Sequence, residues 1–376
     1  MLCGIAWRIH VNVAGDRFDA LRQLCTAAGD KASLAIAMAG LVIDHAFQAR
    51  MREASQLASE AWTLIESVAD PTLTVGLSFA LLYAKAERGE WSDVLRWSQR
   101  VIDLADGDPS KGNFLIGSPL ALGFTSRGNA RWCLGRPGWR DDLQHGLAMA
   151  RSADPMSYAT AVTWVYFAGL PYGVLRPDDS AVREIEDALQ VAERSSDDLA
   201  VALARVTLGV ALVHRDAAAE RDHGHKLLAE ASDVLLRRGH NLCELPLVNV
   251  YSEREKARCG DRDDAIPLMR AAVAHLFREG RLLLFGVAAT GVLVETALDR
   301  GGDGDVAEAE VAIERLVATP AEEGLVIRDI WLLRLRALLA RAHGDEARYR
   351  DYRDRYRDMA TSLGYEGHMK WAEAMP

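Results

Sequence analysis

One short motif recurs along this 376-residue chain and limits how it can fold: a glycine, an acidic residue, and then an apolar stripe with helical spacing. Residues 88–95 (RGEWSDVL) and 259–266 (CGDRDDAI) carry the full motif, and residues 343–347 (HGDEA) carry a shorter copy. Glycine accepts the left-handed backbone that ends a helix, and an acidic residue favours the start of the next helix. The motif therefore predicts helices joined in pairs by tight turns.

The helices on either side of these turns repeat as well. Apolar residues after the turns keep helical spacing, which predicts second helices that each bury one stripe. The expected second helices are 91–105, 139–153, 182–195, 264–277 and 306–317. The expected first helices are 72–88, 119–134, 156–170, 199–214, 242–258, 282–300 and 322–343. Many first helices are apolar around most of their circumference, so they need cover on both sides, as stacked hairpins provide.

These patterns predict an all-α fold without a sheet, in which helical hairpins stack into a right-handed superhelical solenoid. The equivalent glycines Gly260, Gly302 and Gly344 are about 42 residues apart, whereas tetratricopeptide (TPR) repeats are about 34 residues long. We therefore expect a TPR-like solenoid rather than a strict TPR array. A Pro- and Gly-containing linker after residue 170 divides the expected hairpins into two continuous groups, 1–170 and 178–376.

Composition and charge exclude several classes of partner. The net charge of −10 repels phosphate backbones and anionic lipid heads, so neither a nucleic acid nor a membrane is an expected partner. Residues 155–175 carry no charge, but their serine, threonine, glycine and proline residues favour a buried solenoid helix over a membrane span. Five widely spaced cysteines and a start without a basic leader segment predict a reduced, cytoplasmic protein.

Motifs that carry catalytic chemistry are missing from the sequence. It contains no phosphate-binding P-loop, no G-x-S-x-G nucleophile turn and no H-E-x-x-H metal helix. The histidines His223 and His225, near Asp222 and His214, are read as a solvated helix start rather than a metal site. Acidic pairs such as 141–142, 197–198 and 322–323 are read as helix caps. We therefore predict no enzyme activity, no catalytic residue, no cofactor and no metal.

Aromatic residues suggest where a ligand would bind. Five of the nine tryptophans (Trp91, Trp97, Trp132, Trp139 and Trp164) fall in one third of the chain, either as packing between hairpins or as an aromatic groove for a peptide or a small ligand. In TPR-like stacks the first helices line the inner surface. The predicted groove combines polar and aromatic side chains of three successive first helices. Its candidate residues are Tyr83, Arg127, Asn129, Arg131, Trp132 and Tyr166.

Four stretches resemble a known family: residues 28–41 (AGDKASLAIAMAGL), 107–114 (GDPSKGNF), 134–143 (LGRPGWRDDL) and 362–375 (SLGYEGHMKWAEAM). They are similar to the C-terminal helical-repeat region of large mycobacterial-type regulators. Those regulators also carry a class III adenylate/guanylate cyclase domain, an AAA-like NTPase domain and, in some members, a LuxR-type DNA-binding domain. The resemblance covers nearly the whole chain, but the motifs of the three other domains are missing from it.

This resemblance implies a non-catalytic sensor or scaffold module of a cyclase or ATPase regulator. The expected partner is a protein or peptide, including cyclase or ATPase domains, and a small effector is a further candidate. Two alternatives remain open. The chain is a fragment of a class III adenylate cyclase or ATPase signalling enzyme whose catalytic domains lie elsewhere, or it is part of a LuxR-type transcriptional regulator without its DNA-binding domain.

Overall fold

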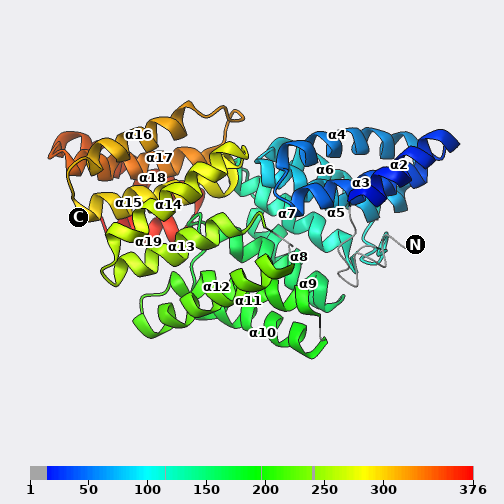
Figure 1. Cartoon of the computed structure of the whole chain (residues 1–376), viewed down its shortest axis with the longest axis horizontal. Coiled ribbons are helices and arrows are strands. Elements are labelled where there is room, and N and C mark those ends of the chain that lie inside the picture. The colour runs from blue at the N-terminus through cyan, green and yellow to red at the C-terminus, as the bar shows by residue number, and fades with distance from the viewer. Residues whose placement is uncertain (1–14, 115, 196, 239–241, 376) are drawn as a thin grey trace.

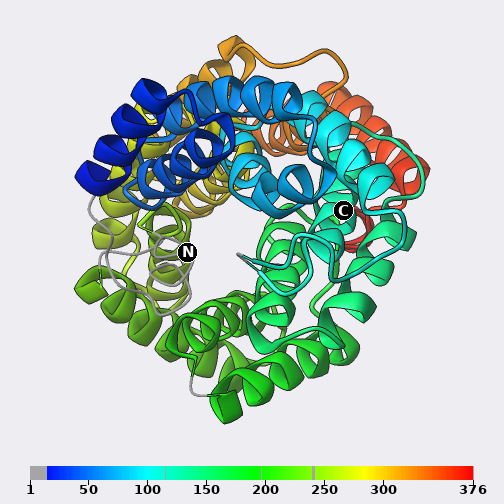
Figure 2. The ribbon, with the colours of Figure 1, turned by 90° about the vertical axis from the view of Figure 1, so that its right-hand side faces the viewer.

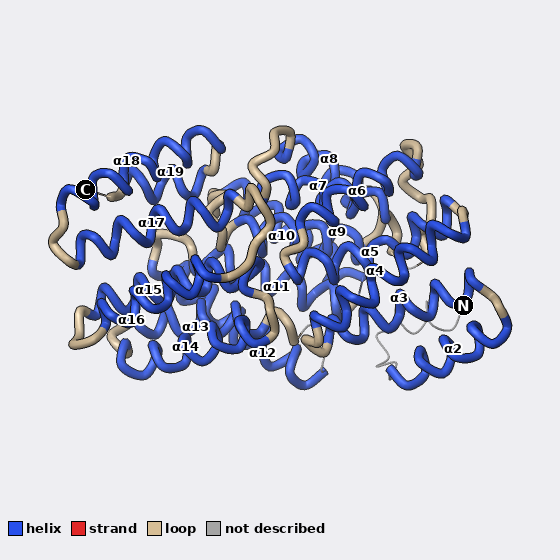
Figure 3. The backbone as a smooth tube through the Cα atoms, turned by 90° about the horizontal axis from the view of Figure 1, so that it is seen from above, coloured by secondary structure: helices blue, strands red, loops and turns tan. Residues whose placement is uncertain are grey.

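The computed structural model describes residues 15–114, 116–195, 197–238 and 242–375. These residues form 18 α-helices, α2 to α19, and two short π-helical segments, η1 and η2, and they contain no β-strand (Figure 1). The predicted all-α class is therefore confirmed. The tube in Figure 3 shows the same arrangement from above, with the helices joined by short loops.

The helices pack as hairpins in chain order, each with a first helix and a second helix. The first helices are α3 (Lys31–Phe47), α5 (Pro71–Arg88), α7 (Pro119–Cys133), α9 (Pro155–Val162) with η1 (Thr163–Phe167), α11 (Asp198–Val213), α13 (Leu245–Arg258), η2 (Leu282–Gly286) with α15 (Val287–Arg300), and α17 (Val326–Ala342). The second helices are α4 (Met51–Val68), α6 (Trp91–Ala105), α8 (Trp139–Arg151), α10 (Asp179–Ser195), α12 (Ala218–Arg238), α14 (Arg262–Arg278), α16 (Asp305–Ala318) and α18 (Glu346–Leu363). The helices α2 (Gly15–Ala28) and α19 (Glu366–Glu373) flank the hairpins.

A side-chain cap and left-handed glycines set the ends of helices at positions that the sequence predicted. Asp70 accepts hydrogen bonds from the backbone N–H groups of Thr72 and Leu73, at 2.8 and 3.2 Å, while Pro71 occupies the first turn of α5. At the other end of α5, Gly89 has φ 72°, the predicted left-handed conformation. Gly260, after α13, has φ 117°, which also requires glycine. The glycine motif therefore ends helices as expected.

The hairpins wind into a right-handed superhelix. Seen from the end that carries α2, the chain runs clockwise while it recedes from the viewer (Figure 2). One superhelical turn brings η2 against α5 and α17 against α7. A single cluster of buried apolar residues runs through the stack from Phe18 to Met375. The division into groups 1–170 and 178–376 remains a prediction.

Hydrogen bonds join successive superhelical turns. The backbone N–H of Leu242 donates to the carbonyl of Phe47 at 3.2 Å, and Arg140 Nη2 donates to the carbonyl of Gly364 at 2.5 Å. The Tyr365 hydroxyl donates to the carbonyl of Trp132. Residues that meet in this way are about 190 to 230 positions apart in the chain. The second turn therefore lies directly against the first.

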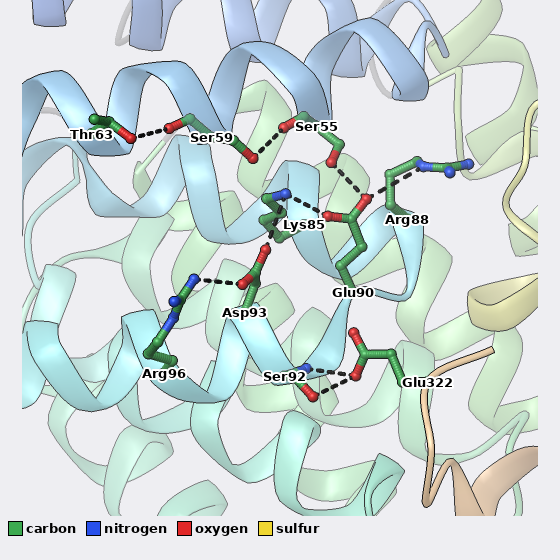
Figure 4. A network of polar contacts seen from close by, with 10 residues as sticks. All are labelled: Ser55, Ser59, Thr63, Lys85, Arg88, Glu90, Ser92, Asp93, Arg96 and Glu322. Atoms are coloured by element: carbon green, nitrogen blue, oxygen red, sulfur yellow. Dashed lines mark hydrogen bonds and ion pairs between the residues drawn. The ribbon is translucent and has the colours of Figure 1, made fainter.

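A polar network at α4, α5 and α6 shows how one such junction is held (Figure 4). Buried Lys85 pairs with Glu90 and, at 3.2 Å, with Asp93. From the next superhelical turn, Glu322 accepts hydrogen bonds from the backbone N–H and the hydroxyl of Ser92, at 2.9 and 2.7 Å. Glu322 is thus a helix cap, as predicted, but it caps α6 rather than the helix that follows it in the sequence.

Residues 155–169 run as one continuous helix, close to the helix predicted over 156–170, but its middle has π-helical hydrogen bonding. Helix α9 ends at Val162 and continues as the π-helical segment η1. A second π segment, η2, forms the start of the first helix that continues as α15. In the part of the chain that the structure describes, no helix is long and apolar enough to cross a membrane.

Candidate ligand-binding cavity

A cavity of about 70 Å³ lies on the inner side of the superhelix, where the two turns meet. Most of the wall comes from first helices and their extensions, α3, α5, α7, α9, η1, α11 and η2, and Trp91 at the start of α6, Ile116 and Glu244 complete it. Both π segments contribute, through Trp164 and Phe167 in η1 and through Leu284 and Phe285 in η2. Such segments often mark functional sites, because they redirect side chains out of the regular helical pattern.

Seven of the nineteen residues that line the cavity are aromatic. The rings of Tyr83 and Trp164 stack with centroids 6.0 Å apart, and Phe79 lies 5.8 Å from Trp164. Phe47 meets Tyr83 edge to face at 6.1 Å. These rings come from α3, α5 and η1, so the wall exists only when these helices are stacked. A wall of this kind binds apolar or cationic groups through ring faces and edges.

Two carboxyl groups interrupt the apolar wall, those of Glu87 and Glu244. Glu87 forms a buried ion pair with Arg281, which is only 1% exposed and also donates to the carbonyl of Cys243. The Tyr83 hydroxyl lies 3.0 Å from the Cys243 sulfur. Burial raises the pKa of Glu87, while the neighbouring Arg281 opposes that shift. Glu87 and Arg281 therefore neutralise each other.

Glu244 has no such counter-ion. Its side chain precedes α13, the residue is 6% exposed, and its Oε2 has no hydrogen-bond partner among the described residues. Burial raises the pKa of Glu244 well above its ordinary value, and the charge of Glu87 raises it further, while Arg281 and the Tyr83 hydroxyl lower it. Burial without a counter-ion therefore favours the protonated form of the Glu244 carboxyl. The indole N–H of buried Trp91, another wall residue, also lacks a partner in the described part of the chain.

Three of the predicted groove residues come together at this cavity. Tyr83 and Asn129 line it, and Trp132 lies fully buried behind Asn129. The Trp132 indole N–H donates to Asn129 Oδ1 at 2.9 Å, while Asn129 Nδ2 donates to the carbonyl of Trp164 at 2.9 Å. Asn129 therefore holds the wall in place through internal hydrogen bonds.

The other three predicted residues lie elsewhere, so the expected convergence on one patch is wrong. Arg127 forms a two-pronged ion pair with Asp142, at 2.9 and 2.5 Å, and Arg131 binds the same carboxylate at 2.7 Å. Tyr166 lines a separate pocket beside α8. The physical reason is helical periodicity: Arg127 and Arg131 are four residues apart and share a face of α7, whereas Asn129 lies two residues from each and faces away.

We expect Arg127→Ala to lower the free energy of unfolding by about 1 to 3 kcal/mol, because it leaves buried Asp142 with Arg131 alone. Urea unfolding measures this loss. Arg96→Ala is the matched control, because the Arg96 side chain is 70% exposed in its ion pair with Asp93 and such pairs contribute little. An unchanged stability combined with weaker ligand binding would instead restore Arg127 to the predicted groove.

The five clustered tryptophans divide between the two predicted roles. Trp91 and Trp164 line the cavity. Trp97 stacks on Trp62 with centroids 4.5 Å apart, Trp139 packs edge-on against Tyr365, and Trp132 supports Asn129. Within the described residues, no group of three or more histidine, cysteine or acidic side chains is arranged to hold a metal ion.

Comparisons with known proteins assign no family to the chain. No protein-family model and no curated protein matches it. Among solved structures it is similar to a circular tandem repeat protein described as having a novel repeat topology and enhanced subunit contact surfaces. The identity is 15%, the alignment covers 99% of this chain and 100% of that chain, and the TM-score is 0.24.

Proposed function

We propose that the chain is a non-catalytic regulatory module that binds a small effector in the cavity between its two superhelical turns. The observation that carries this proposal is the aromatic wall, which is assembled from residues as distant in the sequence as Phe47 and Phe285. An effector in this cavity contacts both turns at once. Its binding would therefore favour the closed superhelix over more open states, and a partner protein can read that change on the outer surface.

The chemistry of the cavity supports binding rather than catalysis. Burial raises the pKa of the Cys243 thiol well above its ordinary value, and the nearby carboxyl groups raise it further. The thiol is therefore protonated at neutral pH and is a poor nucleophile. Burial also raises the pKa of the Tyr83 hydroxyl, so it stays protonated at neutral pH and cannot act as a general base.

The finer proposal concerns the partner. The four stretches that resemble the repeat region of cyclase- and ATPase-containing regulators support a role beside such domains, with this chain as their sensor or scaffold. The alternative, a fragment of a signalling enzyme, predicts that cyclase or NTPase domains are encoded in the same reading frame. The DNA sequence that flanks the coding region therefore separates the two proposals.

A library of small metabolites, screened by thermal shift, tests the effector site. We expect an effector at 100 times its dissociation constant to stabilise the wild-type chain by about 2.7 kcal/mol. Leu203→Trp places a larger side chain in the cavity wall and should abolish this shift. Leu268→Trp is the matched control, because Leu268 is exposed on α14. Effectors that stabilise wild type and Leu203→Trp equally would place the binding site elsewhere.

A further inference from the structure

We propose that the cavity selects organic cations, with a protonated amine held by Glu244 and an apolar or aromatic body held by the surrounding rings. This inference rests on the proposed effector site and adds the chemical class of its ligand. Two independent features point to it: an acidic group without a counter-ion, and a wall made of aromatic rings.

The charge balance of the cavity carries the first step. Glu87 has Arg281 as its partner, so this pair adds no net charge. No ion pair joins Glu244 to any described residue, and one of its carboxyl oxygens has no hydrogen-bond donor there. A buried carboxylate is stable only when a cation and hydrogen-bond donors accompany it. A ligand ammonium group supplies both, with three N–H donors in a compact charge.

The aromatic wall carries the second step. Tyr83, Phe79 and Trp164 present a nearly stacked set of rings beside the acidic group. Ring faces attract cations and accommodate apolar ligand bodies, and the attraction strengthens where water is excluded. An anionic ligand would meet Glu244 and Glu87 but no basic side chain among the described residues that line the cavity, because Arg281 lies behind Glu87 with its two terminal nitrogens bound to Glu87 and to the Cys243 carbonyl.

The protonation state of Glu244 determines how strongly the cavity attracts a cation. The groups that surround the Glu244 carboxyl are Glu87, Arg281, Tyr83 and Cys243; burial and Glu87 raise its pKa more than Arg281 and Tyr83 lower it, which favours the protonated form in the free chain. A bound ammonium group favours the carboxylate, so binding releases a proton from Glu244. Affinity for an amine should therefore rise with pH until the carboxyl of the free chain is itself ionised, since Glu244 loses its proton more readily at higher pH.

Calorimetric titration with 2-phenylethylamine and its uncharged counterpart 2-phenylethanol tests the proposal. These probes share an aromatic body and differ in the charged group. We expect the wild-type chain to bind the amine at least about tenfold more tightly at neutral pH. Titrations in phosphate and in HEPES, two buffers that differ in ionisation enthalpy, should show release of up to about one proton for each amine bound.

Glu244→Gln is the decisive variant, because glutamine is the neutral isostere of the protonated acid and preserves the fold of the free chain. It should lose the preference for the amine, the proton release and the pH dependence, while its affinity for 2-phenylethanol stays unchanged. Glu66→Gln, on the exposed face of α4, is the matched control and should behave as wild type.

The remaining outcomes would overturn the cation proposal, the role of Glu244 or both proposals. Equal binding of the amine and the alcohol by the wild-type chain would overturn the cation proposal and leave the effector site standing. The same conclusion follows if neither probe binds but the metabolite library yields an uncharged or anionic effector that Leu203→Trp blocks. Amine binding that persists in Glu244→Gln would show that another group binds the cation, and would overturn the role proposed for Glu244. If neither the probes nor the library yield a ligand of the cavity, both proposals fail.

Discussion

Arg281→Met is expected to lower the free energy of unfolding by about 3 to 5 kcal/mol, because it leaves the buried carboxylate of Glu87 without its counter-ion. The pair also joins the two superhelical turns, since Glu87 lies at the end of α5 and Arg281 lies directly before η2. The loss should grow as pH rises above about 4.5. An unpaired Glu87 must then either ionise in the protein interior or hold a proton that the unfolded chain gives up.

Urea unfolding of the wild type, of Arg281→Met, of a double variant and of an exposed-pair control measures this loss of stability. The double variant Glu87→Leu with Arg281→Met should recover most of the lost stability, because an apolar pair leaves no buried charge. Arg355→Met is the control for an exposed pair: the side chains of Arg355 and Asp351 are 59% and 61% exposed, so its effect should stay below about 0.5 kcal/mol. A loss below about 1 kcal/mol for Arg281→Met would show that the pair does not hold the turns together.

Local signals in the sequence were sufficient for most helix boundaries. The predicted helix 91–105 coincides with α6, and the predicted helix 72–88 begins one residue late. These ends depend on side chains within three or four positions, such as the Asp70 cap and the Gly89 turn, so a short window of sequence contains them. Helices α2, α3, α4, α12 and α19 were not anticipated. Helices α4 and α12 do not follow the glycine motif, and Arg50 before α4 provides no side-chain cap.

The cavity could be predicted only in part. That first helices line the inner surface follows from the architecture, and Tyr83, Asn129 and the aromatic residues Trp91 and Trp164 do line the cavity. Regular helical periodicity could have separated Arg127 and Arg131 from Asn129, because residues two positions apart do not share a helix face. Residues that are close in the sequence of a helix can therefore point to different surfaces, as Asn129 and its two neighbouring arginines do.

No short sequence motif indicated that Glu87 would be buried at the cavity. Glu87 precedes Arg88 near the polar end of α5, where a solvated side chain is the ordinary expectation. It is buried because a full superhelical turn brings Arg281 to it, 194 residues later in the chain. The pitch of the superhelix sets that meeting, and small angles at every hairpin add up to the pitch. No motif of a few residues contains this information.

The contact that closes the stack at α19 depends on two glycines. Gly367 lies on α19 directly against Gly173, and a Cβ atom at position 367 would come within 2.8 Å of the Gly173 Cα and carbonyl oxygen. This approach allows two backbone hydrogen bonds, from His368 N–H to the Gly173 carbonyl at 2.8 Å and from Glu366 N–H to the Val174 carbonyl at 3.1 Å. Backbone cannot move aside as a flexible side chain can.

We therefore expect Gly367→Ala to lower the free energy of unfolding by about 2 to 4 kcal/mol, through overpacking and the loss of these hydrogen bonds. Intrinsic preference predicts the opposite sign, because alanine favours a helix over glycine by about 1 kcal/mol. Gly123→Ala on α7 is the matched control, since the nearest contact of its Cβ would be a Val101 methyl group at 3.3 Å, on a side chain that can shift, and its effect should stay within about 1 kcal/mol. Urea unfolding gives both values, and hydrogen exchange of the α19 amides shows whether this helix detaches first. A stabilised Gly367→Ala protein would mean that α19 does not dock against Gly173, whereas a loss confined to Gly367→Ala would assign the closure of the superhelix to this glycine pair.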